Sequence, residues 1–324
     1  MNEPDLLYLS RQDVESLNIG MREVMDAVER ALLEKGRGTA EMPPKPGIHP
    51  RPDAFIHAMP AYLEKARGAG LKWVSGFPRN LERGLPYISG LLVLNDVDTG
   101  FPLAVMDCTW ITGVRTGAAT GVAAKYLARP DATTAGILAC GLQGRTNLEA
   151  LACLFPLSRV HAYDIDSEAA AEFVDEMEAK LDLEIVPVRS PEEAVRSMDL
   201  VVTSGPILRN PSPSILPGWL SPGSFACPLD FDSYWTGAAL AEVDKLATDD
   251  LGQLEYYRSV GYFGDTPHPY ADLGEIVAGA RPGRESEVER TLSLNLGLAI
   301  EDVATALLIY EKARKQGAGV RLPL

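Results

Sequence analysis

Cysteine is scarce in this chain of 324 residues, and long apolar runs are missing from it. The four cysteines are widely spaced and form no CxxC pair, which argues against a disulfide framework and against a zinc site or other metal centre. No run of 18 consecutive apolar residues occurs, so we expect no transmembrane helix. The first residues, MNEPDLLYLS, lack the basic and apolar segments of a signal peptide, and we therefore expect a cytoplasmic protein.

Basic side chains are also few in number. Thirty Lys and Arg residues stand against 45 Asp and Glu residues, for a formal net charge of −15. Nonspecific nucleic-acid binding and adhesion to an anionic membrane both need cationic patches, so we expect neither kind of partner. The 46% apolar and 23% charged content is typical of a globular protein, and the length allows two or three domains.

The first third of the chain predicts a mixed α+β domain. A short strand over 6–9 precedes a helical pattern that runs from Val14 to Leu32. Residues 40–62 contain six prolines and predict an irregular region or an edge strand. Apolar runs joined by short turns then predict an antiparallel or mixed sheet within 54–112.

The middle of the chain predicts a different architecture. A helix rich in small residues covers 115–128, and from residue 133 strands alternate with helices. This βαβαβ order is typical of a doubly wound parallel sheet. A long helical pattern over about 287–315, interrupted near Gly297, closes the chain, and we expect it to pack back on the first domain.

A glycine-rich turn follows the first strand of this middle region. Dinucleotide-binding folds place such a turn before a helix, so that backbone amides reach a pyrophosphate at the helix N-terminus. The pattern is G-x-G-x-x-G with Ala139 in place of the first glycine. The alternative is a glycine turn that binds no nucleotide. We expect the cofactor to bind at this turn and at the ends of the neighbouring strands. The expected cofactor-binding residues are Cys140, Gly141, Leu142, Gln143, Gly144, Asp164, Ile165, Thr203 and Ser204.

Asp164 selects between the two nicotinamide cofactors. It lies roughly 20 residues after the turn, where an acidic residue commonly binds the ribose 2′-hydroxyl. A carboxylate there would repel a 2′-phosphate, so the sequence favours NAD over NADP. The alternative is that Asp164 only caps the following helix.

Five further side chains are candidates for substrate chemistry. Lys45, Lys72 and Arg115 could bind a substrate carboxylate, although solvated or structurally paired cations are the alternative. His57 could be a titrating site residue or a structural histidine. Asp230 follows an apolar run at the expected C-terminal edge of the sheet, where a carboxylate could act as a general base or could cap a helix.

Several segments together resemble the ornithine cyclodeaminase/mu-crystallin family, and the resemblance covers nearly the whole chain. The segments that carry it are HAMPAYL (57–63), GLKWVSGF (70–77), TGFPLAVMDCTWITGVRTGAATGVAAKYLARPD (99–131), GLQGRTNLEAL (141–151) and LGEIVAG (273–279). The resemblance implies a homodimer of two-domain subunits. It also implies hydride exchange between a nicotinamide and the α-carbon of an amino or imino acid.

The resemblance also implies roles for individual residues. Lys72 corresponds to the family's substrate-binding lysine, which we count as catalytic as well, and Arg115 to its carboxylate-binding arginine. Lys45 stands where an arginine is common, and Asp230 corresponds to the acid/base aspartate of the cyclodeaminases. His57 stands where cyclodeaminases carry a glutamate near the substrate side chain, which argues against ornithine as the substrate.

We therefore expect an α/β fold with a Rossmann-type, doubly wound NAD domain over 115–297. Residues 1–114 with 298–324 form the expected mixed α+β substrate-binding and dimerisation domain. The expected function is NAD(H)-dependent redox chemistry on a small amino or imino acid. One alternative is a cyclodeaminase that releases ammonia and recycles NADH internally; another is a noncatalytic nucleotide- or ligand-binding protein.

Overall fold

A computed structural model of the chain describes residues 5–51 and 53–324. These residues form two compact units. Unit 1 comprises the chain up to Arg115 together with Leu298–Leu324, and unit 2 comprises Thr116–Gly297. Because unit 1 is built from both ends of the chain, unit 2 is an insertion into it.

Unit 1 is a mixed sheet with helices on one face. Its strands, in sheet order β16-β1-β7-β6-β5-β4-β2 with β3 also paired to β4, are antiparallel except for the β1–β7 pair. The strands are β1 (Asp5–Leu9), β2 (Ala40–Glu41), β3 (Gly47–Arg51), β4 (Ala54–Leu63), β5 (Gly68–Gly76), β6 (Ile88–Asn95), β7 (Pro102–Asp107) and β16 (Val320–Pro323). The helices are α1 (Arg11–Ser16), α2 (Met21–Gly36), the 3₁₀ helix η1 (Pro78–Arg83), α10 (Ala299–Gln316) and the start of α3 (Thr109–Leu127).

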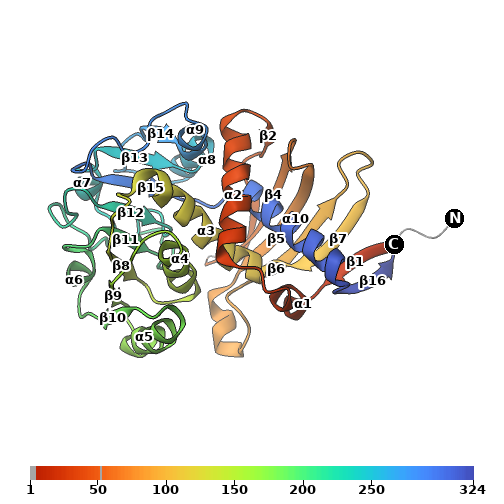
Figure 1. Cartoon of the computed structure of the whole chain (residues 1–324), viewed down its shortest axis with the longest axis horizontal. Helices are drawn as coiled ribbons and strands as arrows, with labels where there is room; N and C mark the ends of the chain where they lie inside the picture. Colours follow the sequence, from red (N-terminus) through yellow and green to blue (C-terminus); the bar gives the residue numbers. More distant parts are fainter. Residues whose placement is uncertain (1–4, 52) are drawn as a thin grey trace. The chain divides into compact units, whose positions relative to one another are not determined.

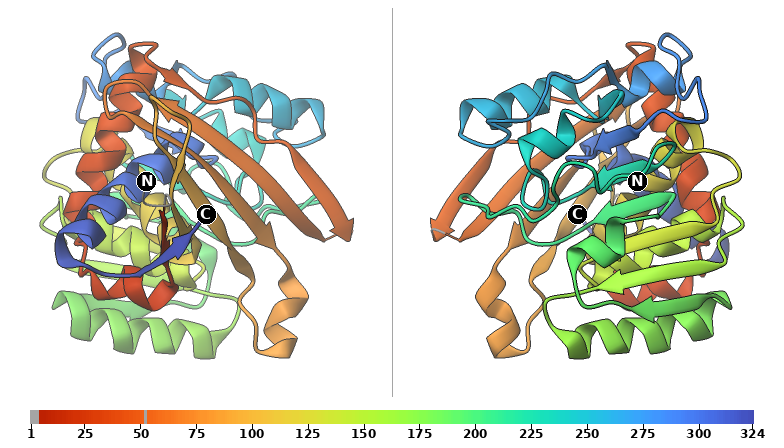
Figure 2. Two further views of the ribbon diagram at one scale, coloured as in Figure 1. Left: turned by 90° about the vertical axis from the view of Figure 1, so that its right-hand side faces the viewer. Right: turned by 90° about the vertical axis from the view of Figure 1, so that its left-hand side faces the viewer.

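Side-chain alternation along β5 separates the two faces of this sheet. Lys72 and Val74 are buried, whereas Trp73 between them is 46% exposed. Helix α10 contacts α2 and the strands β4, β5 and β6, so the buried face is the one that the helices cover. Figures 1 and 2 show α2 and α10 along this side of the long strands. The expectation that the last helix packs on the first domain is thus confirmed.

The sequence predicts one helix from the pattern between Val14 and Leu32, but the structure has two, α1 and α2. Asn18 adopts a left-handed conformation with φ of 51°, which ends α1. The carboxylate of Glu23 accepts a hydrogen bond from the backbone N–H of Gly20, and this contact begins α2. Apolar residues kept the helical spacing across the break, so periodicity alone did not reveal it.

The proline-rich region contains a long, fully paired strand, and the expectation of an irregular or edge segment is wrong for its second half. Strand β4 pairs with β5 from Phe55 to Leu63. Pro60 is tolerated because the N–H of Ala58, two residues earlier, points away from β5 to the carbonyl of Pro46. The missing N–H of Pro60 therefore falls on the same side, away from the β5 ladder.

Unit 2 is a parallel, doubly wound sheet, as the βαβαβ order predicted. The strand order is β10-β9-β8-β11-β12-β15-β13-β14, and each recorded pair is parallel. The strands are β8 (Thr134–Leu138), β9 (Arg159–Tyr163), β10 (Glu184–Pro187), β11 (Leu200–Thr203), β12 (Phe225–Pro228), β13 (Lys245–Thr248), β14 (Ala271–Asp272) and β15 (Thr291–Leu294). The helices are the rest of α3, α4 (Leu142–Ala152), α5 (Ser167–Leu181), α6 (Pro191–Val195), α7 (Gly237–Leu240), α8 (Leu251–Ser259) and α9 (Leu273–Val277).

Strand order reverses between β8 and β11 in this sheet. From β8 the chain builds outward through β9 and β10, and then returns to add β11 and β12 on the other side. Open α/β sheets bind ligands at such a switch point, beyond the carboxyl ends of the strands. The end of β8 is where the glycine-rich turn begins.

The expectation of one helical pattern over 287–315 is wrong in its first part. Residues Thr291–Leu294 form β15, which lies between β12 and β13 and is completely buried. Helix α10 starts only at Ala299. A short apolar run cannot be assigned to strand or helix from its periodicity alone, and tertiary pairing decided this case.

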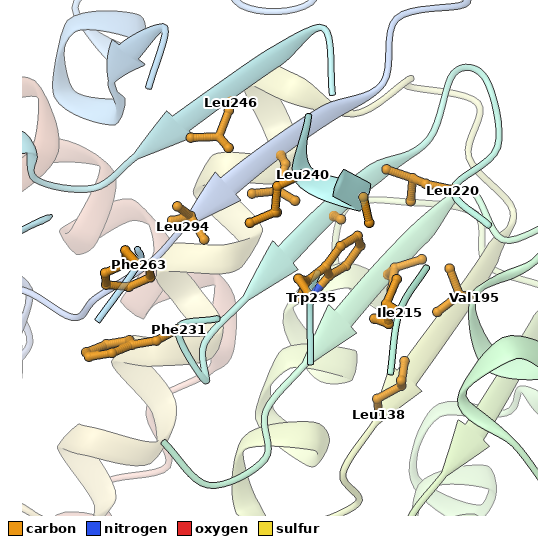
Figure 3. Close-up of a cluster of buried hydrophobic side chains, with 14 of the residues drawn as sticks. Leu138, Val195, Ile215, Leu220, Phe231, Trp235, Leu240, Leu246, Phe263 and Leu294 are labelled. Atoms are coloured by element: carbon orange, nitrogen blue, oxygen red, sulfur yellow. The ribbon is translucent and has the colours of Figure 1, made fainter. Parts of the chain in front are cut away.

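The core of unit 2 includes a buried cluster that Figure 3 shows against one face of these strands. Trp235 is 1% exposed, and Phe231 and Phe263 pack with ring centroids 4.9 Å apart. These side chains follow β12 and α8 and fix the loop after β12, which carries Asp230.

Candidate functional site

The glycine-rich turn has the backbone geometry of a dinucleotide site. Gly141 is the N-cap of α4 and has no side-chain cap, and a Cβ built on it would meet no atom within 4 Å. That open space lets a ligand approach the amides of the first helical turn. Gly144, in contrast, packs its Cα against β8, because a Cβ there would lie 2.5 Å from the Ala139 carbonyl oxygen. The turn thus combines an open N-terminus with close helix–strand packing, which fits a pyrophosphate.

Ala139 occupies the first motif position in a left-handed conformation with φ of 73°. An L-residue with a Cβ pays roughly 1–2 kcal/mol for this geometry, whereas glycine does not. The turn keeps the glycine conformation although it lacks the glycine. The substitution therefore adds strain and leaves the fold of the motif intact.

Asp164 lies beside the turn at the end of β9. Its Oδ2 accepts a 2.7 Å hydrogen bond from the backbone N–H of Cys140, and its Oδ1 accepts one from Asp166. The N-cap of α5 is Asp166, not Asp164, because the Asp166 side chain accepts from Glu168. The capping alternative for Asp164 is therefore excluded, and the carboxylate is oriented at the glycine turn.

The other expected cofactor residues divide by exposure. Leu142 and Ile165 are 54% and 91% exposed, so these apolar side chains can cover a ligand. Cys140 is buried, and Gln143 is half-buried in the first turn of α4. The hydroxyl of Ser204 donates to the Ala139 carbonyl at 3.1 Å, which ties the end of β11 to the turn.

Asp230 is completely buried after β12, at the same edge of the sheet. Its Oδ1 accepts from the Thr203 hydroxyl at 2.9 Å, and its Oδ2 accepts from the Gly205 N–H at 3.0 Å. The Thr203 oxygen itself accepts from the Trp235 indole N–H at 3.1 Å. With its oxygen accepting from the indole N–H, the Thr203 hydroxyl keeps its proton free to donate to the Asp230 carboxylate.

Burial sets the acidity of this carboxyl group. Removal from water raises the pKa of Asp230 to about 7, although the Gly205 and Thr203 hydrogen bonds oppose the rise. A group with a pKa near neutrality can both give and take a proton at working pH. Thr203, which the sequence predicts at the cofactor, uses its hydroxyl to orient Asp230, and its contact with the cofactor stays a prediction.

Lys72 and Arg115 are brought together in unit 1, and both are buried. Lys72 Nζ lies 2.7 Å from Asp302 Oδ1, and the same oxygen accepts from Arg115 Nε at 3.0 Å. Arg115 Nη1 donates to Glu301 Oε2 at 3.0 Å. The solvated alternative is therefore wrong for both cations, and they are paired with carboxylates of α10.

Glu301 and Asp302 are functional candidates that the sequence reasoning missed. Both are fully buried, and burial raises the pKa of Glu301. One oxygen of each, Glu301 Oε1 and Asp302 Oδ2, has no hydrogen-bond partner in the structure. The available signal was an acidic pair inside the apolar run LGLAIEDVATALL, because buried carboxylates need cations.

His57 lies on β4 above Gly47 and stacks on Phe55 with ring centroids 4.3 Å apart. A Cβ at Gly47 would lie 2.3 Å from the imidazole, so only glycine leaves room for the ring. Burial, followed by the charges of Lys45, His49 and Lys72, lowers the pKa of His57 to about 4. The imidazole is therefore neutral at pH 7, in surroundings that disfavour positive charge. Lys45 itself is half-buried between β2 and β3.

The described part of the chain has neither a metal-binding cluster nor a membrane-spanning helix. No group of three or more His, Cys, Asp or Glu residues within 5–51 and 53–324 is arranged to hold a metal ion. No helix among the same residues combines the length and apolar character needed to cross a membrane. All four cysteines are free thiols; Cys108, Cys140 and Cys227 are buried and Cys153 is half-buried.

Comparison with known proteins gives matches over the whole chain. The model of the ornithine cyclodeaminase/mu-crystallin family matches residues 5–317. Alanine dehydrogenase of Archaeoglobus fulgidus is 38% identical and covers 98% of each chain.

Solved structures give the same result. Thermococcus litoralis Delta(1)-pyrroline-2-carboxylate reductase, in complex with NADH and L-proline, superposes with a TM-score of 0.88 at 38% identity, covering 98% of this chain and 100% of that one. An archaeal alanine dehydrogenase dimer with bound NAD has a TM-score of 0.87 at 37% identity, covering 98% and 99%. The expected fold class, the expected NAD cofactor and the expected class of amino- or imino-acid oxidoreductase are confirmed at this level.

Proposed function

Because the chain belongs to the ornithine cyclodeaminase/mu-crystallin family, we propose that it catalyses net NAD(H)-dependent redox chemistry on a small α-amino or α-imino acid. The acid/base part of this proposal is carried by Asp230, a buried carboxyl group with a pKa of about 7 at the carboxyl end of the nucleotide sheet, and the choice of net redox over cyclodeamination is carried by His57. NAD, when bound at the turn, supplies or accepts the hydride at the substrate's α-carbon.

Substrate binding falls to the cations of unit 1. Lys72 and Arg115 bind the α-carboxylate, and Lys45 adds positive charge on the side of His57. Arginine and lysine both form charge-assisted hydrogen bonds with a carboxylate, and the buried setting strengthens them. A fixed carboxylate also fixes the α-carbon, and orientation of this kind supplies much of an enzyme's rate.

Proton transfer falls to Asp230. In the reductive direction the protonated carboxyl gives its proton to the α-nitrogen, and in the oxidative direction the carboxylate takes it back. Thr203 and the Gly205 N–H hold the two carboxyl oxygens during both steps. Removal of a general acid or base typically costs about 10²–10⁴-fold in rate.

His57 favours net redox over cyclodeamination. A diamino acid would bring a second ammonium group into the side-chain region. The groups that act on His57 there are Lys45, His49 and Lys72, and the imidazole itself stays neutral. This environment suits a substrate with an uncharged side chain. Alanine and proline have such side chains; one relative is named alanine dehydrogenase, and another was solved in complex with L-proline.

The first experiment uses purified protein, NAD⁺ in catalytic amount and a panel of L-amino acids that includes alanine, proline, ornithine and lysine. Absorbance of NADH and release of ammonia are followed in one reaction. We expect NADH to rise with alanine in step with ammonia, or, in a second reaction supplied with NADH and cyclic imino acids, NADH to be consumed. Asp230→Asn, which keeps the shape of the side chain, is the matched control and loses either activity.

Two results would contradict the proposal. Ammonia far in excess of the NAD⁺ supplied, without lasting NADH, would establish a cyclodeaminase. NADH binding without turnover of any amino or imino acid would favour the noncatalytic alternative.

A homodimer is part of the same proposal. The sheet face of unit 1 opposite its helices is apolar and partly open: Trp73 is 46% exposed, and Leu91, its cross-strand neighbour on β6, is 47% exposed. Ile48 on β3 is 55% exposed. A second copy of this chain could cover this surface, and one relative is named as a dimer. The cytoplasmic location expected from the sequence stays a prediction.

A further inference from the structure

Lys72 is an ammonium group with little access to water. It is 1% exposed, and its Nζ lies 2.7 Å from Asp302 Oδ1 and 3.5 Å from the Thr112 hydroxyl. Strand β5 and helix α10 are 230 residues apart at this contact. A lysine in such a place carries its charge only if a nearby anion offsets the loss of hydration.

Arg115 differs from Lys72 in this respect. Its guanidinium donates to both Glu301 and Asp302, but it stays charged at any accessible pH. The two carboxylates of α10 therefore have different consequences. Glu301 hydrogen-bonds Arg115 and acts on Lys72 only through its charge, whereas Asp302 contacts the Lys72 ammonium directly.

We propose that Asp302 is a positioning residue that keeps Lys72 protonated and aimed for the substrate's carboxylate. This inference rests on the proposed function, since it assumes that Lys72 binds that carboxylate. Neutral lysine is a poor carboxylate ligand, because the charge-assisted part of the hydrogen bond is gone. Loss of the Asp302 charge should thus weaken substrate binding in a pH-dependent way, and most strongly at pH values where Lys72 then loses its proton.

The neighbours of Lys72 support this assignment. Burial lowers the pKa of Lys72 and Asp302 raises it, while the positive charge of Arg115 on α3 lowers it further. Cys108, just after β7, has a pKa of about 12, and His57 on β4 has a pKa of about 4. Neither group changes charge between pH 6 and 9.

The test measures binding of pyrrole-2-carboxylate, a planar carboxylate without a titratable amine, to the protein saturated with NADH. Dissociation constants are measured from about pH 6.5 to about pH 9 for wild type, Asp302→Asn and Glu301→Gln. The quantity compared is the ratio of each variant's constant to that of the wild type at the same pH. Titrations shared by all three proteins, including that of Asp230, cancel in this ratio.

For Asp302→Asn we expect the ratio of dissociation constants to lie within about threefold of unity near pH 6.5. The ratio should rise at least about tenfold towards pH 9, because binding that needs one protonated group weakens tenfold per pH unit above the pKa of that group. For Glu301→Gln, the matched control in the same cluster that does not contact Lys72 directly, the ratio changes much less over the same pH range. NADH affinity and the melting temperature show that each variant is folded, and Asp302→Ser replaces Asp302→Asn if the latter does not fold.

Two outcomes overturn the inference in distinguishable ways. A ratio for Asp302→Asn that is constant across the pH range assigns Asp302 a structural role only and leaves the proposed function standing. Failure of the wild type to bind the carboxylate at any pH removes the proposed substrate clamp, and this inference with it.

Discussion

Asp230 shows how one buried side chain can favour catalysis at the expense of stability. In the folded protein the Asp230 carboxyl group is neutral in acidic solution and charged in alkaline solution, and its pKa is about 7. An unfolded chain has the ordinary Asp pKa of about 3.9. Between these two values the folded state holds a proton that the unfolded state does not. Stability contributed by the neutral form is therefore full below about pH 4 and is lost as the pH rises to about 7.

Asp230→Asn should remove this pH dependence, because an amide does not ionise. We expect the free energy of unfolding of the variant, relative to wild type, to increase by several kcal/mol between about pH 4 and about pH 8. Urea denaturation of the ligand-free proteins at these pH values measures it. A difference that does not vary with pH would show that Asp230 titrates normally in the folded protein.

The residue scale is also where prediction from sequence reached its limit. Asp230, Lys72 and Arg115 could be singled out because their types and positions suggest chemistry. Glu301 and Asp302 could not, because their importance comes from contacts with residues 186 and 230 positions away. No local pattern encodes such a pairing; only the packing of α10 on β5 reveals it.

At the scale of the elements, α4 shows two uses of glycine within one turn of helix. Gly141 leaves space at the helix N-terminus, and Gly144 allows the helix to lie against β8. The first serves a ligand and the second serves the fold. Alanine substitution should separate these functions.

Gly141→Ala should leave the melting temperature nearly unchanged and weaken NADH binding by at least about tenfold, because the new methyl group occupies the space in front of the α4 amides. Gly144→Ala should instead destabilise the protein by about 1–3 kcal/mol, as overpacking does. Fluorescence titration with NADH and thermal melts measure the two effects. Equal NADH affinity in Gly141→Ala and wild type would place the pyrophosphate elsewhere.

Element prediction succeeded where a pattern was long and failed where it was short. Strand–helix alternation between residues 133 and 204 gave the parallel sheet and the place of the turn. The four-residue strand β15 was read as helix, because TLSL carries no periodicity of its own. This segment is a strand because it pairs with β12 on one side and β13 on the other.

For the whole molecule, the apolar outer face of the unit 1 sheet is the feature that a single subunit leaves unexplained. Leu71 and Trp73 on β5 face Val93 and Leu91 on β6, and Val105 on β7 continues the row. Contiguous apolar surface of this kind usually marks a protein interface.

Trp73→Glu should therefore convert a dimer to a folded monomer, since a charge in the centre of an apolar interface weakens association by at least about 10²-fold. Light scattering after size-exclusion chromatography reports the mass. Val288→Glu, at an apolar position of unit 2 that is 68% exposed, is the control and should leave the mass unchanged. A wild-type protein that is already monomeric would refute the proposed dimer.

The antiparallel pairing of β1 with β16 has a consequence for the order in which the protein is made. Tyr8 pairs with Val320, so the unit 1 sheet cannot be completed until Val320 has left the ribosome. Unit 2, encoded by one uninterrupted segment, is free to fold earlier. During that interval Glu301 and Asp302, which pair with Arg115 and Lys72 in the folded protein, have not yet been synthesised. A chain truncated after Gly297 should therefore fold unit 2 but leave unit 1 without α10 and its carboxylates Glu301 and Asp302.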